Sequence, residues 1–268
     1  MLRTFLSIAG ALIFLFLFVR YIEIRSLYVP FRQVYGTPKT LGLAYDDLFL
    51  VTPDRVTVNA WFIPRTGAKF TLFYLHGNGG NLSHRLPQIS LFHELGVNIF
   101  IVDYRGYGLS TGRPSEKGIY TDAQTSYDYL KATLKIPANR IILFGESLGT
   151  AVAVHLAEKN QVRAIILAGG FTSAAQLSRR VYPFLPTFFL TSRFDSLSVI
   201  DKIQVPKLFI HSVNDEIVPF DMGLKLFQAA AAPKEFFEIH GGHNDAFVTD
   251  RENLKKRMHA FFESLVQL

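Results

Sequence analysis

Residues 145–149 read Gly-Glu-Ser-Leu-Gly, and their surroundings constrain the fold more than any other stretch of the chain. The residues before them, 140–144, form a short apolar run typical of a buried strand. The residues after them, 150–159, are rich in alanine and have the aliphatic spacing of a helix packed on that strand. The sequence therefore predicts a strand, a tight turn at Ser147 and a helix, with the flanking glycines leaving room for their close approach.

Strands and helices also alternate along the rest of the chain. Segments 44–51 and 56–63 are predicted to pair as antiparallel strands around a turn at Pro53-Asp54. Further strands are predicted at 70–75, 97–102, 140–144, 163–167, 207–210 and 235–239, and helices at about 83–95, 117–134 and 150–159 and after residue 245. This alternation predicts an α/β fold with about eight mostly parallel strands and helices on both faces.

The N-terminal segment is predicted to be a membrane anchor comprising residues 1–22. Residues 4–19 carry no charge and are flanked by Arg3 and Arg20, and snorkelling of Arg20 extends the span. A cleaved signal peptide is the alternative, although the apolar region lacks a cleavage site of small residues. The arginines that follow the span favour a cytoplasmic domain.

Three segments follow from these patterns: the anchor, a linker at 23–42 that contains two prolines and two glycines, and an α/β domain at 43–268. Residues 171–200 interrupt the alternation of strands and helices and are rich in phenylalanine and leucine. This segment is longer than an ordinary loop and is predicted to form a short helical cap over Ser147.

Composition excludes several classes of protein. Hydrophobic residues make up 49% of the chain, enough for a large core, and the absence of cysteine excludes disulfides and thiolate sites. The net charge is +6, but its densest cluster, 255–257, is better explained as a solvated helix face than as a nucleic-acid site. No metal-binding motif is present, so neither a metal nor a cofactor is expected.

Two loops can complete a catalytic site around Ser147. A serine hydroxyl needs a base within hydrogen-bond reach and an acid that orients the base. Asp215 follows the strand at 207–210 and His243 follows the last strand, and the carboxyl ends of parallel strands meet at one edge. We therefore predict a triad of Ser147, His243 as the general base and Asp215 as the acid.

Other residues compete for these roles. Asp215 is also compatible with a purely structural turn, and Glu216, Asp221 and Asp245 are alternative acids. His240 is the nearest alternative base.

The glycine-rich loop at 76–81 follows the predicted strand at 70–75. Its position predicts that the backbone N–H groups of Asn78 and Leu148 stabilise an oxyanion. The loop lacks the Lys-Ser/Thr pair of a phosphate-binding loop. A second glycine-rich stretch, 103–108, is predicted to be a structural turn, with Asp103 and Arg105 in a local hydrogen-bond network.

Aromatic side chains of the cap are candidates for an acyl-chain pocket. The candidates are Phe171, Tyr182, Phe184 and Phe188, with Phe189 and Phe194 as further possibilities. For each of them the alternative is simple packing of the cap onto the core.

The motifs together resemble a known family. They are HGNGGNLSHR at 76–85, DYRGYGLSTG at 103–112, GESLG at 145–149, NDEIVP at 214–219 and GGHND at 241–245. With the N-terminal apolar segment, they resemble the α/β-hydrolase superfamily and its bud-emergence-type branch of membrane-anchored serine hydrolases. The resemblance covers nearly all of the chain after residue 40, and the family's triad maps onto Ser147, Asp215 and His243. Gly79, where relatives often have alanine, is a small departure.

The resemblance implies a membrane-anchored serine hydrolase that cleaves esters or thioesters through an acyl-enzyme. The anchor favours lipid-like substrates, which include lipids and lipidated proteins. One alternative is a non-catalytic, membrane-tethered binding protein on the same scaffold. The other is an esterase for small soluble esters.

Overall fold

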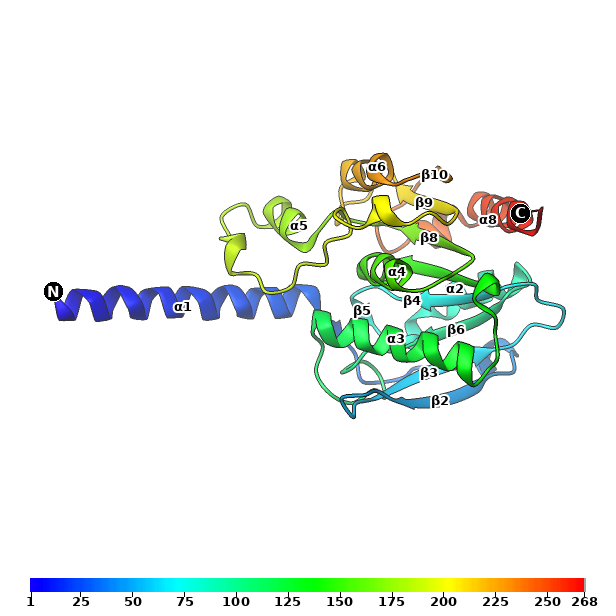
Figure 1. Cartoon of the computed structure of the whole chain (residues 1–268), viewed down its shortest axis with the longest axis horizontal. Helices are drawn as coiled ribbons and strands as arrows, with labels where there is room; N and C mark the ends of the chain where they lie inside the picture. The colour runs from blue at the N-terminus through cyan, green and yellow to red at the C-terminus, as the bar shows by residue number, and fades with distance from the viewer. Residues whose placement is uncertain (268) are drawn as a thin grey trace.

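An eight-stranded sheet forms the centre of the protein, whose computed structural model describes residues 1–267 (Figure 1). Its strands are β2 (Asp46–Val51), β3 (Thr57–Ile63), β4 (Thr71–Leu75), β6 (Asn98–Val102), β7 (Ile141–Glu146), β8 (Ala164–Ala168), β9 (Lys207–Ser212) and β10 (Lys234–Ile239). The order across the sheet is β10-β9-β8-β7-β4-β6-β3-β2. The β2–β3 and β3–β6 pairs are antiparallel, and the other pairs are parallel.

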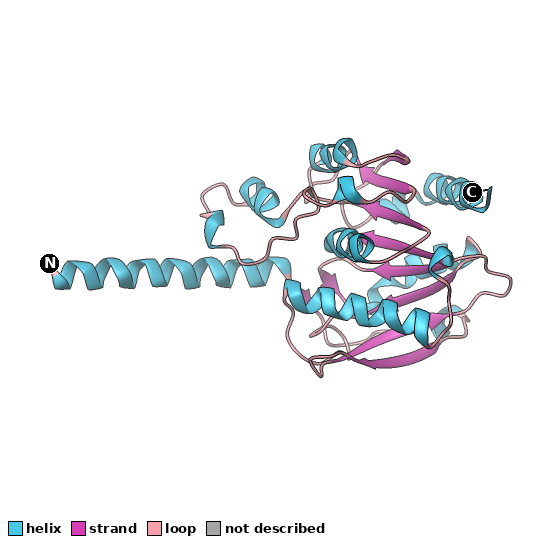
Figure 2. Cartoon of the chain, viewed as in Figure 1, coloured by secondary structure: helices cyan, strands magenta, loops and turns pink. Residues whose placement is uncertain are grey.

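The central strands are buried because helices cover both faces of the sheet (Figure 2). The helices of the domain are α2 (Leu86–Glu94), α3 (Glu116–Ala132), α4 (Leu148–Lys159), α5 (Ala174–Val181), α6 (Phe220–Ala229), α7 (Ala246–Thr249) and α8 (Arg251–Gln267). Short 3₁₀ helices lie at Pro38–Leu41, Leu82–Arg85, Ala138–Arg140, Thr187–Phe189 and Ile200–Lys202.

Two apolar clusters form the core, one on each face. Tyr127 of α3, Val152 of α4 and Leu226 of α6 belong to one cluster. Phe92 of α2 and Met258 of α8 belong to the other. The sheet and its two helical layers confirm the predicted α/β fold.

The predicted helix at 83–95 differs in its start. The structure has a 3₁₀ turn at Leu82–Arg85, and α2 begins only at Leu86. The Asn81 side chain caps that turn, and a proline occupies the first turn of α2.

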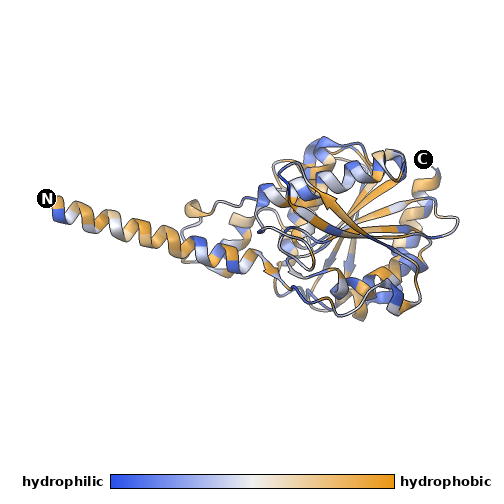
Figure 3. Cartoon of the chain, turned by 90° about the horizontal axis from the view of Figure 1, so that it is seen from below, coloured by the Kyte–Doolittle hydropathy of each residue, from blue (hydrophilic) through white to orange (hydrophobic). Residues whose placement is uncertain are grey.

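Helix α1 (Leu2–Leu27) projects from the domain, and Figure 3 shows apolar residues along it. Its 26 residues correspond to roughly 39 Å at about 1.5 Å per residue, more than the roughly 30 Å of a bilayer's hydrocarbon core. The helix is therefore long and apolar enough to span a membrane, a property that a signal sequence near the N-terminus shares.

The helix continues through residues 23–27, where the sequence predicts the start of a linker. No glycine or proline occurs there, and the first proline after the helix is Pro30, so nothing stops the helix before residue 27. Immediately afterwards, β1 (Val29–Pro30) pairs in parallel with β5 (Gly79–Gly80) in a small separate sheet.

The end of α1 packs against the cap. The cap segment at 171–200 contains α5 and the 3₁₀ turn at Thr187–Phe189, and its chain passes beside α1 (Figure 1). The buried Glu23 carboxylate of α1 accepts hydrogen bonds from the backbone N–H groups of Thr191 at 3.2 Å and Ser192 at 2.6 Å. These contacts fix the direction in which α1 leaves the domain.

Candidate active site

Ser147 lies in the turn between β7 and α4 with a strained backbone, φ 49° and ψ −115°. A Cβ at Gly149 would overlap the carbonyl oxygen of Leu75 on β4. A Cβ at Gly145 would overlap the backbone of Gly149. Both positions therefore require glycine, and the turn presents the Ser147 hydroxyl at the carboxyl edge of the sheet.

The predicted serine, histidine and aspartate meet at this edge. Asp215 lies in the loop after β9, and His243 lies in the loop after β10. His243 Nε2 lies 2.9 Å from Ser147 Oγ, and His243 Nδ1 lies 2.7 Å from Asp215 Oδ2. The Asp215 and His243 side chains are 2% and 9% exposed. In this arrangement an imidazole can accept the serine proton while the carboxylate orients the ring.

Hydrogen bonds keep the Asp215 carboxyl ionised. Its Oδ1 atom accepts the backbone N–H groups of Ile217 at 3.0 Å and Val218 at 2.7 Å, leaving Oδ2 for His243. Burial raises the pKa of Asp215, but its interactions with His243, Val218 and Ile217 lower it by more, so the pKa lies below the usual value. A negative charge on Asp215 then stabilises the imidazolium that forms when His243 takes a proton.

The structure adds His211, which sequence reasoning did not single out. Its Nε2 atom lies 2.9 Å from the carbonyl oxygen of Val218 and 3.6 Å from Asp215 Oδ2. Burial lowers the pKa of His211 and favours the neutral ring. The only signal in the sequence was its place at the end of a buried strand, four residues before Asp215. Across residues 1–267, no group of three or more His, Asp or Glu side chains is arranged to hold a metal ion.

The alternative residues have other partners. Glu216 Oε2 accepts the backbone N–H of His243 at 3.0 Å, so it holds the histidine loop and not the ring. Asp221 forms an exposed ion pair with an arginine of the cap, and Asp245 accepts a backbone N–H of its own turn. The His240 side chain is largely exposed and lies beside a carboxylate of the following turn.

The backbone N–H groups of Asn78 and Leu148 are available as oxyanion donors. Both residues line the same pocket as Ser147, and Leu148 begins α4. Within residues 1–267, neither N–H donates a hydrogen bond to another protein group. The loop that carries Asn78 lies close to Ser147: a Cβ added at Gly77 would be 3.5 Å from the Ser147 Cβ.

The Asn78 loop is held by contacts that could not be predicted from the sequence. Asn78 Nδ2 donates to the carbonyl oxygen of Ser26 at the end of α1 at 3.1 Å. The Val29 N–H donates to the Asn78 carbonyl oxygen at 3.0 Å, and Arg85 Nη2 donates to the Gly79 carbonyl oxygen at 2.6 Å. The N-terminal helix is thereby connected directly to the loop that carries a predicted oxyanion donor.

A pocket of about 360 Å³ lies beside Ser147. Ile22 and Leu27 of α1 line it from one side, and Leu177 and Leu190 of the cap line it from another. Most of the lining side chains are apolar, and the volume lies within the range of pockets that bind small organic ligands.

The four predicted aromatic residues fall into two groups. Phe171 and Tyr182 line this pocket. Phe184 and Phe188 do not line it, and both are highly exposed. The chain that carries them passes along α1, where the Phe189 ring contacts the Phe16 ring, and of residues 183–190 only Leu185 and Leu190 line the pocket.

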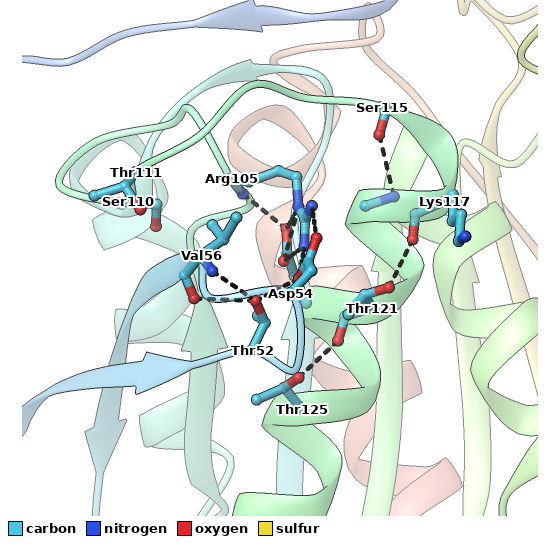
Figure 4. A network of polar contacts seen from close by, with 12 residues as sticks. Thr52, Asp54, Val56, Arg105, Ser110, Thr111, Ser115, Lys117, Thr121 and Thr125 are labelled. Atoms are coloured by element: carbon cyan, nitrogen blue, oxygen red, sulfur yellow. Dashed lines mark hydrogen bonds and ion pairs between the residues drawn. The ribbon is translucent and has the colours of Figure 1, made fainter.

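Arg105 organises the loop between β6 and α3 (Figure 4). Its guanidinium binds Asp122 of α3 through Nη2 at 2.8 Å and Asp54 of the β2–β3 turn through Nη1 at 2.7 Å. The Arg105 N–H also donates to Asp122 Oδ2 at 2.8 Å. The predicted local network is therefore present at Arg105, and it connects the β2–β3 turn to α3.

The fold and the site together define the class of protein. Ser147 lies in a tight turn after a central strand of a mostly parallel sheet, and Ser, Asp and His follow in this order along the chain. This is the arrangement of an α/β hydrolase. A family model described as the alpha/beta hydrolase fold matches residues 71–196. The Pyrococcus furiosus esterase Pf2001 has a similar fold, with a TM-score of 0.75, 21% identity and coverage of 88% of this chain and 98% of that chain.

More similar sequences place the chain within this class. Protein bem46 of Schizosaccharomyces pombe is 37% identical, and the match covers 82% of this chain and 77% of bem46. Alpha/beta hydrolase domain-containing protein WAV2 of Arabidopsis thaliana is 35% identical, with coverage of 85% and 81%. The chain therefore belongs to the α/β-hydrolase superfamily, in the branch that includes bem46.

Proposed function

We propose that this protein is a membrane-anchored serine hydrolase that cleaves carboxylic ester or thioester bonds. The observation that carries the proposal is the line of hydrogen bonds from Asp215 through His243 to Ser147, beside an apolar pocket. Membership of the α/β-hydrolase superfamily supports the same reaction class, and the Pyrococcus furiosus protein of similar fold is itself described as an esterase.

In the first half of the reaction, His243 Nε2 takes the proton of Ser147 while Ser147 Oγ bonds to the substrate's carbonyl carbon. The carbonyl oxygen becomes an oxyanion, which the N–H groups of Asn78 and Leu148 stabilise. The tetrahedral intermediate collapses as the bond to the leaving alcohol or thiol breaks. The His243 imidazolium gives its proton to that leaving group, and an acyl-Ser147 ester remains.

In the second half, a water molecule gives a proton to His243 and attacks the acyl carbon. The bond between Ser147 Oγ and the acyl group breaks, the carboxylic acid leaves, and Ser147 recovers its proton from His243. Each turnover consumes one water molecule and requires no cofactor. Asp215 remains ionised throughout and holds the His243 ring in place.

The apolar lining of the pocket favours an acyl chain as the part of the substrate that the protein recognises. Phe171 and Tyr182 are proposed to contact this chain, together with leucines of the cap and of α1. The apolar lining beside Ser147 favours lipid-like acyl groups over small soluble esters.

Contacts of α1 with the domain favour a retained anchor over a cleaved signal peptide. Val19 and Glu23 are buried, and the Ser26 carbonyl oxygen accepts a hydrogen bond from the Asn78 side chain. Cleavage before residue 27 would remove these contacts and one wall of the pocket. Arg20 and Arg25, near the domain end of α1, favour a domain on the cytoplasmic side.

Hydrolysis of a soluble ester tests the proposal. The full-length protein in detergent is expected to hydrolyse p-nitrophenyl butyrate, and Ser147→Ala and His243→Ala are each expected to lower kcat/KM by ~10³-fold or more. Ser198→Ala, which changes an exposed serine near the end of the cap segment, is the matched control. Full activity of Ser147→Ala would contradict the mechanism. If the wild-type protein hydrolyses neither p-nitrophenyl butyrate nor p-nitrophenyl esters with shorter or longer acyl chains, a non-catalytic binding protein would be favoured.

A further inference from the structure

The cap carries exposed apolar side chains that do not line the pocket. Residues 181–190, here called the cap tip, contain no charged side chain. Phe184 is 100% exposed and Phe188 is 79% exposed. Large apolar side chains grouped in this way on a surface mark an interaction site. Arginines flank the cap tip, with Arg179 and Arg180 before it and Arg193 after it.

The cap tip lies alongside α1 on the part that projects from the domain (Figure 1). Thr191, next to the tip, contacts both Arg20 and Glu23 of α1. The ring of Phe189 lies 5.8 Å from the ring of Phe16, centroid to centroid. Phe16 lies about one helical turn from Arg20 towards the N-terminus of α1. The cap tip therefore reaches about 6 Å further from the domain than Arg20 does.

Charge and position together identify the occupant of this surface as a lipid bilayer. Phe16 and Leu17 of α1 are partly exposed, and the Phe16 ring contacts the Phe189 ring of the cap tip, so apolar side chains of the two segments adjoin. Figure 3 shows that α1 is mostly apolar towards its N-terminus. Arg179 and Arg180 precede the cap tip in the chain, Arg193 follows it, and Arg20 of α1 contacts Thr191 beside it. Arg20 and Arg180 also pair with Glu23 and Asp221. Arginines next to an apolar segment can reach the lipid phosphates at a bilayer surface. A soluble partner that covered the cap tip would also have to cover the adjoining turns of α1.

We propose that the cap tip inserts into the same membrane leaflet as the domain end of α1. The pocket beside Ser147 is walled by Ile22 of α1 and by Leu185 and Leu190 of the cap tip. It therefore adjoins the hydrocarbon region, and an acyl chain enters it from the bilayer without crossing water. This inference rests on the proposed function and identifies its preferred substrates as acyl chains already embedded in the membrane.

Tryptophan fluorescence in vesicles tests the insertion independently of activity. The chain has one tryptophan, the buried Trp61, so the wild-type signal serves as a constant background. The full-length Phe184→Trp variant is reconstituted into phosphatidylcholine and phosphatidylglycerol vesicles with brominated acyl chains. Phe49→Trp, at an exposed position of the edge strand β2, is the matched control.

We expect brominated lipid to quench the added fluorescence of Phe184→Trp and to leave that of Phe49→Trp unchanged. If the tryptophan at position 184 is quenched by aqueous iodide and not by brominated lipid, the cap tip lies in water and the proposal is wrong. Shielding from both quenchers would mean that a second copy or another protein covers the tip, which also overturns the proposal.

An activity test connects the insertion to substrate entry. The Phe184→Ser, Phe188→Ser double variant is compared with wild type on p-nitrophenyl acetate in solution and on a fluorogenic long-chain acyl ester in vesicles. We expect turnover of the vesicle substrate to fall about ten-fold for each phenylalanine removed, with hydrolysis of the soluble ester unchanged. Equal losses on both substrates, or no loss on either, would overturn the proposal. An inactive wild type would instead refute the proposed function, and the quenching result would still stand.

Discussion

Replacing Asp215 by asparagine changes one atom in the line of hydrogen bonds that ends at Ser147. The orientation of the new amide follows from its neighbours. Two backbone N–H groups, of Ile217 and Val218, donate to Oδ1, so the amide oxygen is expected at this position. The amide NH₂ then occupies the position of Oδ2, 2.7 Å from His243 Nδ1.

This orientation reverses the hydrogen bond to His243. An NH₂ group donates to Nδ1, so the neutral ring must carry its proton on Nε2. A protonated Nε2 lies 2.9 Å from Ser147 Oγ and cannot accept the serine proton. Loss of the correct tautomer lowers kcat by ~10⁴-fold in a comparable triad, which corresponds to about 5.4 kcal/mol of lost transition-state stabilisation.

Hydrolysis of p-nitrophenyl butyrate by the full-length protein in detergent measures this loss. Circular dichroism and urea unfolding check that the variant is folded. Glu216→Gln is the matched control, because a glutamine at this position still accepts the His243 backbone N–H. We expect Glu216→Gln to retain activity within about ten-fold of wild type.

Two results would refute this reasoning. If folded Asp215→Asn keeps more than about a tenth of the wild-type kcat, Asp215 does not set the tautomer of His243. If Glu216→Gln loses more activity than Asp215→Asn, Glu216 and not Asp215 is the functional acid.

Three further predictions concern stability and are measured by urea unfolding. Gly149→Ala places a Cβ against a carbonyl oxygen of β4 and is expected to cost about 3 kcal/mol or more, whereas Gly79→Ala meets open space and should change stability by less than about 0.5 kcal/mol; equal effects would contradict the packing argument. Arg105→Ala leaves the carboxylate of Asp122 buried without its partner and is expected to cost about 3–5 kcal/mol; a cost below about 1 kcal/mol would contradict this. Folding lowers the pKa of His211 below its value of about 6.5 in the unfolded chain. The neutral ring therefore contributes fully to the free energy of unfolding above about pH 6.5, and this contribution is lost as the pH falls through the pKa of the folded state. His211→Gln should therefore weaken the fall in stability between about pH 7.5 and pH 5, and an unchanged pH dependence would contradict the assignment.

Much of the fold and the grouping of Ser147, Asp215 and His243 followed from local sequence. Each of the three residues comes directly after or shortly after a recognisable apolar strand. Once the strands are known to be parallel, their carboxyl ends must share one edge, and the side chains that follow them are brought together.

The contacts of α1 with the domain were not predictable in this way. Glu23 binds the backbone of Thr191 and Ser192, and Asn78 binds the carbonyl oxygen of Ser26, although these partners are far apart in the chain. Periodicity reports only which face of an element is buried and says nothing about its partner. The linker was therefore predicted to start at residue 23, where the helix in fact continues.

The aromatic residues of the cap show a second limit. Phe171, Phe184 and Phe188 were candidates for the same pocket on composition alone. Phe171 and the fourth candidate, Tyr182, line it, whereas Phe184 and Phe188 are exposed on the part of the cap that passes along α1. An irregular segment has no period from which the direction of its side chains can be read.

Mapping the site of a covalent inhibitor tests the central claim most directly. A fluorophosphonate reacts with a serine only when a base activates its hydroxyl. Trypsin cleavage after Arg140 and Lys159 releases residues 141–159, in which Ser147 is the only serine. We predict one phosphonate per chain on this peptide, and none on the Ser147→Ala protein. A wild-type protein that remains unlabelled, or that carries the label on another peptide, would contradict the assignment of Ser147 as the nucleophile.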